Sequence, residues 1–128
     1  MNRYVLFFPI IFSVLLAAGS AAEYQPGDPK YSGLNGKWEN RSKVMLIELK
    51  VVNGNELVGF STLRYSQPRP GETYGPLQGK IIDDETIEFS VAWPRGTNSY
   101  VLKKQEDGSL LGPHPTLVGR RLGFTKID

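Results

Sequence analysis

The regular spacing of turn signals is the feature that most constrains the fold of this chain. From residue 34 onwards, short runs that alternate apolar and polar residues are separated by clusters of Gly, Asn, Asp and Pro, and no useful stretch has a helical period. Side chains of a strand alternate between its two faces, so each run can bury one face. The pattern predicts about eight short strands, over residues 34–42, 43–52, 56–65, 74–82, 86–93, 99–105, 110–112 and 116–127.

Three segments give the clearest local predictions. Asn53-Gly54 lies between two of the runs, and this dipeptide favours a type I′ hairpin because both central residues of that turn need a positive φ. Residues 86–93 alternate cleanly, with Ile87, Phe89, Val91 and Trp93 on one face. Residues 67–72 contain two prolines, which lack ladder donors, and are expected to form an exposed loop. Sequential hairpins without a long crossover predict an all-β fold, an up-and-down antiparallel β-barrel that closes on itself.

The first 22 residues have the pattern of a signal peptide. Arg3 supplies a positive start, an apolar run follows, and small residues precede a cleavage point after Ala22. A membrane anchor is less favoured because the apolar run is short for a bilayer span. We expect a secreted or periplasmic protein with a flexible leader over 23–33 and one barrel domain over 34–128.

Composition excludes several classes of function. The chain has no cysteine, so it has no disulfide framework, no thiol catalysis and no thiolate metal site. The formal net charge is +2, and removing Arg3 leaves about +1, so no strong field favours nucleic acid or a membrane surface after cleavage.

The run 34–42 places Gly36, Trp38 and Asn40 on one face of the first predicted strand. Trp38 would then fill one part of the barrel interior, and Asn40 would place an amide in the same space. The alternative is that Trp38 is simply core and Asn40 begins a turn, as asparagine often does. Asn40-Arg41-Ser42 also matches the N-glycosylation acceptor pattern, which an inward-pointing Asn40 would make implausible.

Nothing in the sequence indicates catalysis. The single histidine, His114, lies between two prolines and is expected in a loop, while 83–85 is expected to be a solvated acidic turn, not a metal site. The polar groups that could face inward are neutral: Asn40, Ser42, Ser61 and Ser99. Neutral groups beside tryptophans suit the binding of a small molecule, because they orient a ligand while aromatic rings supply contact area.

Several motifs, in this order, resemble the avidin and streptavidin family. They are Gly36-Lys37-Trp38-Glu39-Asn40 with Ser42, Leu57-Val58-Gly59, Gly75-Pro76-Leu77-Gln78-Gly79, Phe89-Ser90-Val91-Ala92-Trp93 and Gly123-Phe124-Thr125-Lys126-Ile127. The resemblance implies an eight-stranded barrel that binds biotin at one end as its ligand, with no further cofactor, and that forms homo-oligomers. Because the C-terminal strands are shorter than the family's and its late tryptophans are missing, we expect a dimer ahead of a tetramer or a monomer.

The resemblance also implies site residues. Asn40 resembles the amide that meets the ureido oxygen of biotin, and Ser42 resembles the hydroxyl beside it. Trp93 resembles a tryptophan of the ring pocket. Asn98 or Ser99 would stand at a hydroxyl position facing the ligand's sulphur, and Tyr100 at an aromatic wall.

The chain departs from the family at positions that matter for affinity. Ser61 stands where the family has a tyrosine, Leu63 where it has a hydroxyl, and Leu122-Gly123 where it has a carboxylate or amide. Trp38 and Trp93 are the only tryptophans, so the family's two late tryptophans are missing. The alternative function is therefore a barrel that has lost its biotin site and acts as a protein-binding module or inhibitor, using 23–33 and 67–72 for contact.

Overall fold

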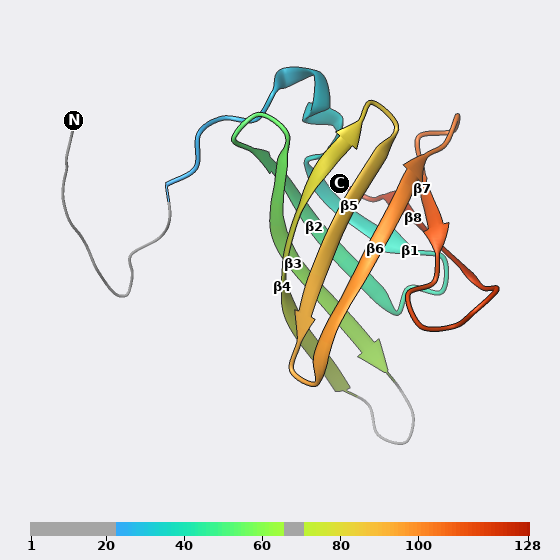
Figure 1. The fold of residues 1–128 in the computed structure, drawn as a ribbon. Helices are drawn as coiled ribbons and strands as arrows, with labels where there is room; N and C mark the ends of the chain where they lie inside the picture. The colour runs from blue at the N-terminus through green and yellow to red at the C-terminus, as the bar shows by residue number, and fades with distance from the viewer. Residues whose placement is uncertain (1–22, 66–70) are drawn as a thin grey trace.

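Eight antiparallel strands close into an up-and-down barrel in the computed structural model, which describes residues 23–65 and 71–128 (Figure 1). Each strand pairs with the next along the chain, and β8 pairs with β1. The all-β barrel predicted from the sequence is thus confirmed. The strands are β1 (Gly36–Asn40), β2 (Met45–Val52), β3 (Glu56–Tyr65), β4 (Gly71–Asp83), β5 (Thr86–Trp93), β6 (Gly96–Lys104), β7 (Leu110–Pro113) and β8 (Arg121–Lys126).

Several strand boundaries differ from the predictions, most of all at β4, β6 and β8. β4 begins at Gly71, which pairs with Tyr65, so the end of the predicted loop 67–72 belongs to a strand. The predicted signal segment 1–22 and the rest of that loop, 66–70, lie outside the described residues. β6 begins at Gly96, directly after the turn formed by Pro94 and Arg95.

The last strand is shorter than the predicted 116–127. The ring nitrogen Nδ1 of His114 accepts hydrogen bonds from the backbone amides of Thr116 (3.2 Å) and Leu117 (3.0 Å). This side chain therefore folds the chain after β7 into a loop, and β8 begins only at Arg121. His114 is a loop residue, as expected from its position between two prolines.

The turn between β2 and β3 follows the prediction in its backbone angles but has three residues, 53–55, between the paired Val52 and Glu56, one more than a two-residue hairpin. Asn53 and Gly54 both adopt positive φ, 51° and 81°, as a type I′ hairpin requires. The turn sets the register in which Val52 pairs with Glu56, and this register puts Ile47, Leu49 and Leu57 inside the barrel. Local turn chemistry therefore decides which face of both strands is buried.

A short 3-10 helix, η1 (Pro29–Leu34), covers one end of the barrel (Figure 1). The Asp28 side chain accepts a hydrogen bond from the backbone amide of Lys30, and Pro29 starts the helix, where a missing N–H costs nothing. The flexible leader expected over 23–33 is therefore partly helical. The preceding residues pair with the β2–β3 turn, where the amides of Asn53 and Gly54 donate to the carbonyls of Gln25 (2.8 Å) and Pro26 (3.1 Å).

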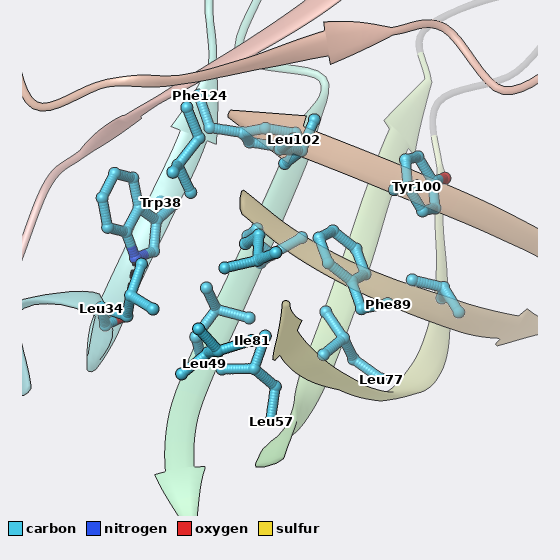
Figure 2. Close-up of a cluster of buried hydrophobic side chains, with 14 of the residues drawn as sticks. Leu34, Trp38, Leu49, Leu57, Leu77, Ile81, Phe89, Tyr100, Leu102 and Phe124 are labelled. Atoms are coloured by element: carbon cyan, nitrogen blue, oxygen red, sulfur yellow. Dashed lines mark hydrogen bonds between the residues drawn. The ribbon is translucent and has the colours of Figure 1, made fainter. Parts of the chain in front are cut away.

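The barrel thus has two different ends. The η1 end carries η1 and the turns at 53–55, 84–85 and 105–109. The Asn40 end carries the connections at 41–44, 94–95 and 114–120. The core fills the space between them with buried side chains from every strand (Figure 2). Trp38 lies toward the η1 end, where its indole N–H donates to the carbonyl of Leu34 at 3.0 Å.

Inward-facing glycines let the strands bend around this core. A Cβ at Gly59 would collide with the carbonyl oxygen of Glu48 on β2, and a Cβ at Gly79 with that of Glu88 on β5. Neighbouring backbones therefore approach closely at these points, which a small barrel needs in order to close. No helix within the described ranges 23–65 and 71–128 is long and apolar enough to span a bilayer.

Candidate functional site: the two ends of the barrel

The structure brings several of the predicted ligand residues to the Asn40 end. Asn40, Ser61 and Tyr100 are buried, with exposed fractions of 8%, 0% and 3%. Trp93 and Asn98 are half-buried at the same end of β5 and β6, on the faces that also carry Val91 and Tyr100. Alternation along each strand explains this placement, since residues two apart share a face.

Asn40 holds the β1–β2 connection. Its carbonyl oxygen Oδ1 accepts a hydrogen bond from the backbone amide of Met45 at 3.0 Å, and its Nδ2 donates to the hydroxyl of Ser42 at 3.2 Å. Asn40 therefore lies inside the barrel and also shapes a turn, so the two interpretations of this residue are compatible. Ser42 itself is exposed in the connection.

Ser61 is fully buried on β3, and its hydroxyl donates to the carbonyl oxygen of Leu46 on β2 at 3.3 Å. That bond satisfies a hydroxyl that would otherwise be costly to bury. The Ser61 hydroxyl therefore already has its hydrogen-bond partner in the backbone of the neighbouring strand.

Tyr100 differs from the other buried polar residues. Its ring stacks on Phe89, with centroids 5.0 Å apart and an interplanar angle of 19°. Figure 2 shows the hydroxyl at the far side of the ring, directed away from Phe89 and from Trp38. Within the described part of the chain this hydroxyl has no hydrogen-bond partner. Buried tyrosines usually do find one, which makes this group a candidate ligand contact.

Ser99 does not face the interior. It is exposed on the outer surface of β6, where its hydroxyl lies 3.2 Å from that of Ser90 on β5. The sequence left Asn98 and Ser99 as alternatives. The register of β5 with β6 places Asn98 opposite Val91, so Asn98 belongs to the inward row and Ser99 does not.

The charged groups near the Asn40 end lie on the outer surface. Arg64 lies 3.3 Å from Glu72 and 3.7 Å from Glu39, and the Tyr74 hydroxyl donates to Glu72 at 2.5 Å. The hydrogen bond to the Glu72 carboxylate raises the pKa of Tyr74. In the described residues, no group of three or more His, Cys, Asp or Glu side chains is placed to hold a metal ion.

The η1 end contains a cavity of about 640 Å³ that no sequence-based prediction included. Its floor is made by apolar core residues, and its rim by η1, the turn at 83–85, the turn at 107–109 and the end of β8. The sequence signal that could have indicated it is Asp28-Pro29, an N-cap followed by a helix-starting proline. Because η1 was not predicted, no sequence feature indicated a cavity at this end of the barrel.

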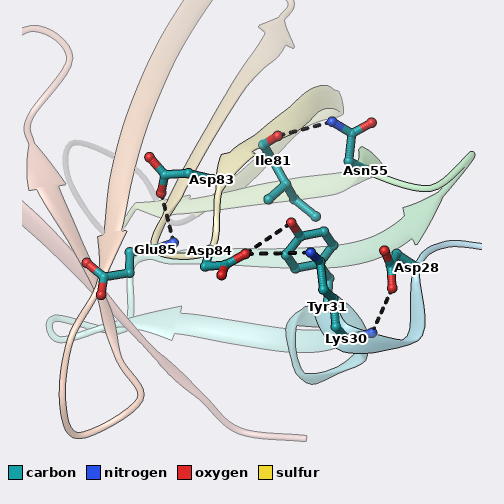
Figure 3. A network of polar contacts seen from close by, with 8 residues as sticks. All are labelled: Asp28, Lys30, Tyr31, Asn55, Ile81, Asp83, Asp84 and Glu85. Carbon is teal, nitrogen blue, oxygen red and sulfur yellow. Dashed lines mark hydrogen bonds and ion pairs between the residues drawn. The ribbon is translucent and has the colours of Figure 1, made fainter.

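Polar contacts link η1 to the barrel across this cavity (Figure 3). Asp84 accepts a hydrogen bond from the Tyr31 hydroxyl at 3.3 Å and lies 3.9 Å from the Lys30 ammonium. Asp83 accepts from the backbone amide of Glu85 at 2.9 Å, and this bond lowers the pKa of the exposed Asp83 carboxyl. The acidic residues are all solvent-exposed, as predicted, with Asp83 at the end of β4 and the turn itself at 84–85.

Comparison of the chain with profiles of known protein families, with curated proteins and with solved structures found no match.

Proposed function

We propose that this protein is an exported, non-catalytic barrel that binds a small molecule, biotin or a related compound, at the Asn40 end. The observation that carries the proposal is the hydroxyl of Tyr100, a residue only 3% exposed, which has no hydrogen-bond partner in the described residues. A ligand that bonds this hydroxyl would remove the cost of leaving it unsatisfied, about 1–3 kcal/mol.

The neighbouring residues supply what a small ring system needs. Trp93 offers an aromatic face at the rim, and Asn98 offers an amide on the inward row of β6. Asn40 retains one N–H of its amide beyond the bond to Ser42. Biotin is proposed on the resemblance of the motifs that carry Asn40 and Trp93. The missing family tryptophans imply weaker binding, at about a tenfold loss per 1.4 kcal/mol.

Contacts of the leader weigh against the alternative, a protein-binding module that uses 23–33 as a free arm. The Asn53 and Gly54 amides bind the carbonyls of Gln25 and Pro26, so this part of the leader is occupied by the barrel itself. A homo-oligomer of such barrels remains part of the proposal, on the resemblance alone.

Thermal unfolding with and without excess biotin tests the proposal. Ligand at about a thousand times its dissociation constant adds roughly 4 kcal/mol. For a domain of this size the expected shift is about 15 °C or more. Absence of a shift would retire biotin as the ligand.

A pair of tyrosine variants tests the role of the hydroxyl. Tyr100→Phe keeps the ring that stacks on Phe89 but removes the hydroxyl, so we expect the biotin-induced shift to fall sharply. Tyr74→Phe removes an exposed hydroxyl on the outer surface and should leave the shift unchanged. An equal shift in both variants would show that the ligand does not bond Tyr100.

A further inference from the structure

The cavity at the η1 end lies apart from the residues proposed for biotin. Its volume, about 640 Å³, falls in the range of roughly 300–1,000 Å³ found for small-molecule sites. Trp38 lines this cavity, whereas Trp93 lies at the opposite end of the barrel. The described residues therefore form a half-open cavity at the η1 end, with its own aromatic residue.

The floor of the cavity is apolar and needs no polar partner. Its apolar side chains are almost fully buried, and the Trp38 indole N–H among them already donates to the Leu34 carbonyl, while the buried Thr86 adds a hydroxyl to the lining beside them. A surface of this kind favours an apolar ring or chain over water, because water there lacks hydrogen-bond partners. The floor residues are Leu34, Trp38, Ile81, Ile87 and Leu110.

The rim is polar, but neither sign of charge dominates it. Three lysines (Lys30, Lys104 and Lys126) face four carboxylates (Asp83, Asp84, Glu85 and Asp107). All seven side chains belong to exposed residues, so salt and water screen their fields. A rim of nearly balanced charge does not select an anion or a cation, whereas its many donors and acceptors can bond a neutral polar edge.

Several polar groups of the rim already form hydrogen bonds or ion pairs within the protein. Asp107 accepts from the amide of Ser109 at 2.9 Å, and the Lys126 ammonium donates to the carbonyl of Gly33 at 3.0 Å. Asp84 is shared by Lys30 and Tyr31. Lys104 has no carboxylate within ion-pair distance in the described residues, so its side chain is available at the mouth of the cavity.

We propose that the η1-end cavity is a second ligand site, which takes an uncharged amphipathic molecule with an aromatic or alicyclic body. The body lies on Trp38 and the aliphatic floor, and a neutral hydrogen-bonding edge such as an amide or hydroxyl lies at the rim. The site is independent of biotin binding at the Asn40 end.

The two tryptophans of the chain allow each end to be monitored separately in the full-length protein. The probe is 4-iodobenzamide, a neutral amphipathic ring whose iodine quenches indole fluorescence on contact. In Trp93→Phe, which retains only Trp38, we expect quenching that saturates with probe concentration. In Trp38→Phe, which retains only the half-buried Trp93, we expect only the linear quenching of random collisions.

Neighbouring lysines on β6 provide a matched pair of blocking variants in the Trp93→Phe background. Lys104→Phe places a ring at the mouth of the cavity and should lower the affinity for the probe by about tenfold or more. Lys103→Phe makes the same change of charge and composition on a residue that does not line the cavity, and should leave the affinity unchanged.

Three results would overturn the proposal: quenching of Trp38 that does not saturate, equal weakening by Lys104→Phe and Lys103→Phe, or tenfold tighter binding of the anionic analogue 4-iodobenzoate. The last result would indicate an anion site. The biotin-induced thermal shift should be the same in Lys104→Phe as in the unmodified protein. Because the two sites have separate readouts, a negative result at one end of the barrel does not bear on the other.

Discussion

Two stacked aromatic pairs, one inside the barrel and one outside, make a direct test of where the stability of this protein comes from. Phe89 stacks on Tyr100 in the interior with centroids 5.0 Å apart, and Phe60 stacks on Tyr74 on the outer surface with centroids 6.0 Å apart. The interplanar angles are close, 19° and 24°. The pairs differ mainly in burial, since Phe89 is 1% exposed and Phe60 is 47% exposed.

Truncation of each phenylalanine to alanine should therefore have unequal effects. Phe89→Ala removes a fully buried ring and leaves a cavity beside Tyr100, which costs about 3–5 kcal/mol. Phe60→Ala removes a ring that already contacts water over about half its surface, so it loses the stacking contribution and only part of the burial of a core ring, about 1 kcal/mol or slightly more in total. For a domain of about 100 residues these values correspond to losses in melting temperature of about 15–30 °C and about 5 °C.

Urea unfolding followed by tryptophan fluorescence and by far-UV circular dichroism measures both variants. An unchanged slope of free energy against urea would show that the midpoint shift reports stability alone. Equal losses for Phe60→Ala and Phe89→Ala would refute the reasoning, because they would mean that the inward and outward rows of β3 and β5 are not as described.

Further predictions concern turns and backbone contacts. Gly59→Ala should cost about 1–3 kcal/mol of unfolding free energy in urea, because its Cβ meets a carbonyl oxygen of β2; a neutral result would mean that the strand can shift. Asn40→Ala should cost about 1–3 kcal/mol by leaving the first amide of β2 without its acceptor, whereas Asn40→Asp keeps the acceptor and should cost less. The Asp107 carboxyl accepts from the Ser109 hydroxyl and amide, which lowers the Asp107 pKa, so Ser109→Ala should raise that pKa in an NMR titration. Because the pKa is lowered, the contribution of Asp107 to stability is present above the ordinary aspartate pKa and is lost as the pH falls through the lowered value.

The amino-acid pattern predicted most of the strands because the relevant signals are local. Alternation of apolar residues identified the inward face of β5, and Asn53-Gly54 predicted the hairpin between β2 and β3. The burial of Ile87, Phe89 and Val91 follows this prediction, since a period of two leaves each side chain only one possible face. Because the chain has no cysteine and thus no disulfide, an apolar core was also predicted to stabilise the fold.

Boundaries and loops depended on contacts that the sequence does not display. The Nδ1 atom of His114 folds residues after β7 into a loop, so the last strand is shorter than its apolar pattern suggested. The segment before Leu34 carries no apolar period, and its structure comes from Asp28 capping η1 and from pairing with the β2–β3 turn.

The candidate sites show the same difference between features that strand alternation predicts and features that only the closed barrel reveals. Strand alternation was enough to predict that Asn40 and Trp38 share a face and that the polar groups near them are neutral. The closed barrel was needed to show that Ser99 points outward and that the Tyr100 hydroxyl is buried without a partner in the described residues. The cavity at the η1 end likewise exists only in the closed barrel, because its lining residues come from η1 and from β1, β4, β5, β6, β7 and β8. A linear pattern specifies the face of each strand, whereas the meeting of distant strands depends on closure of the whole sheet.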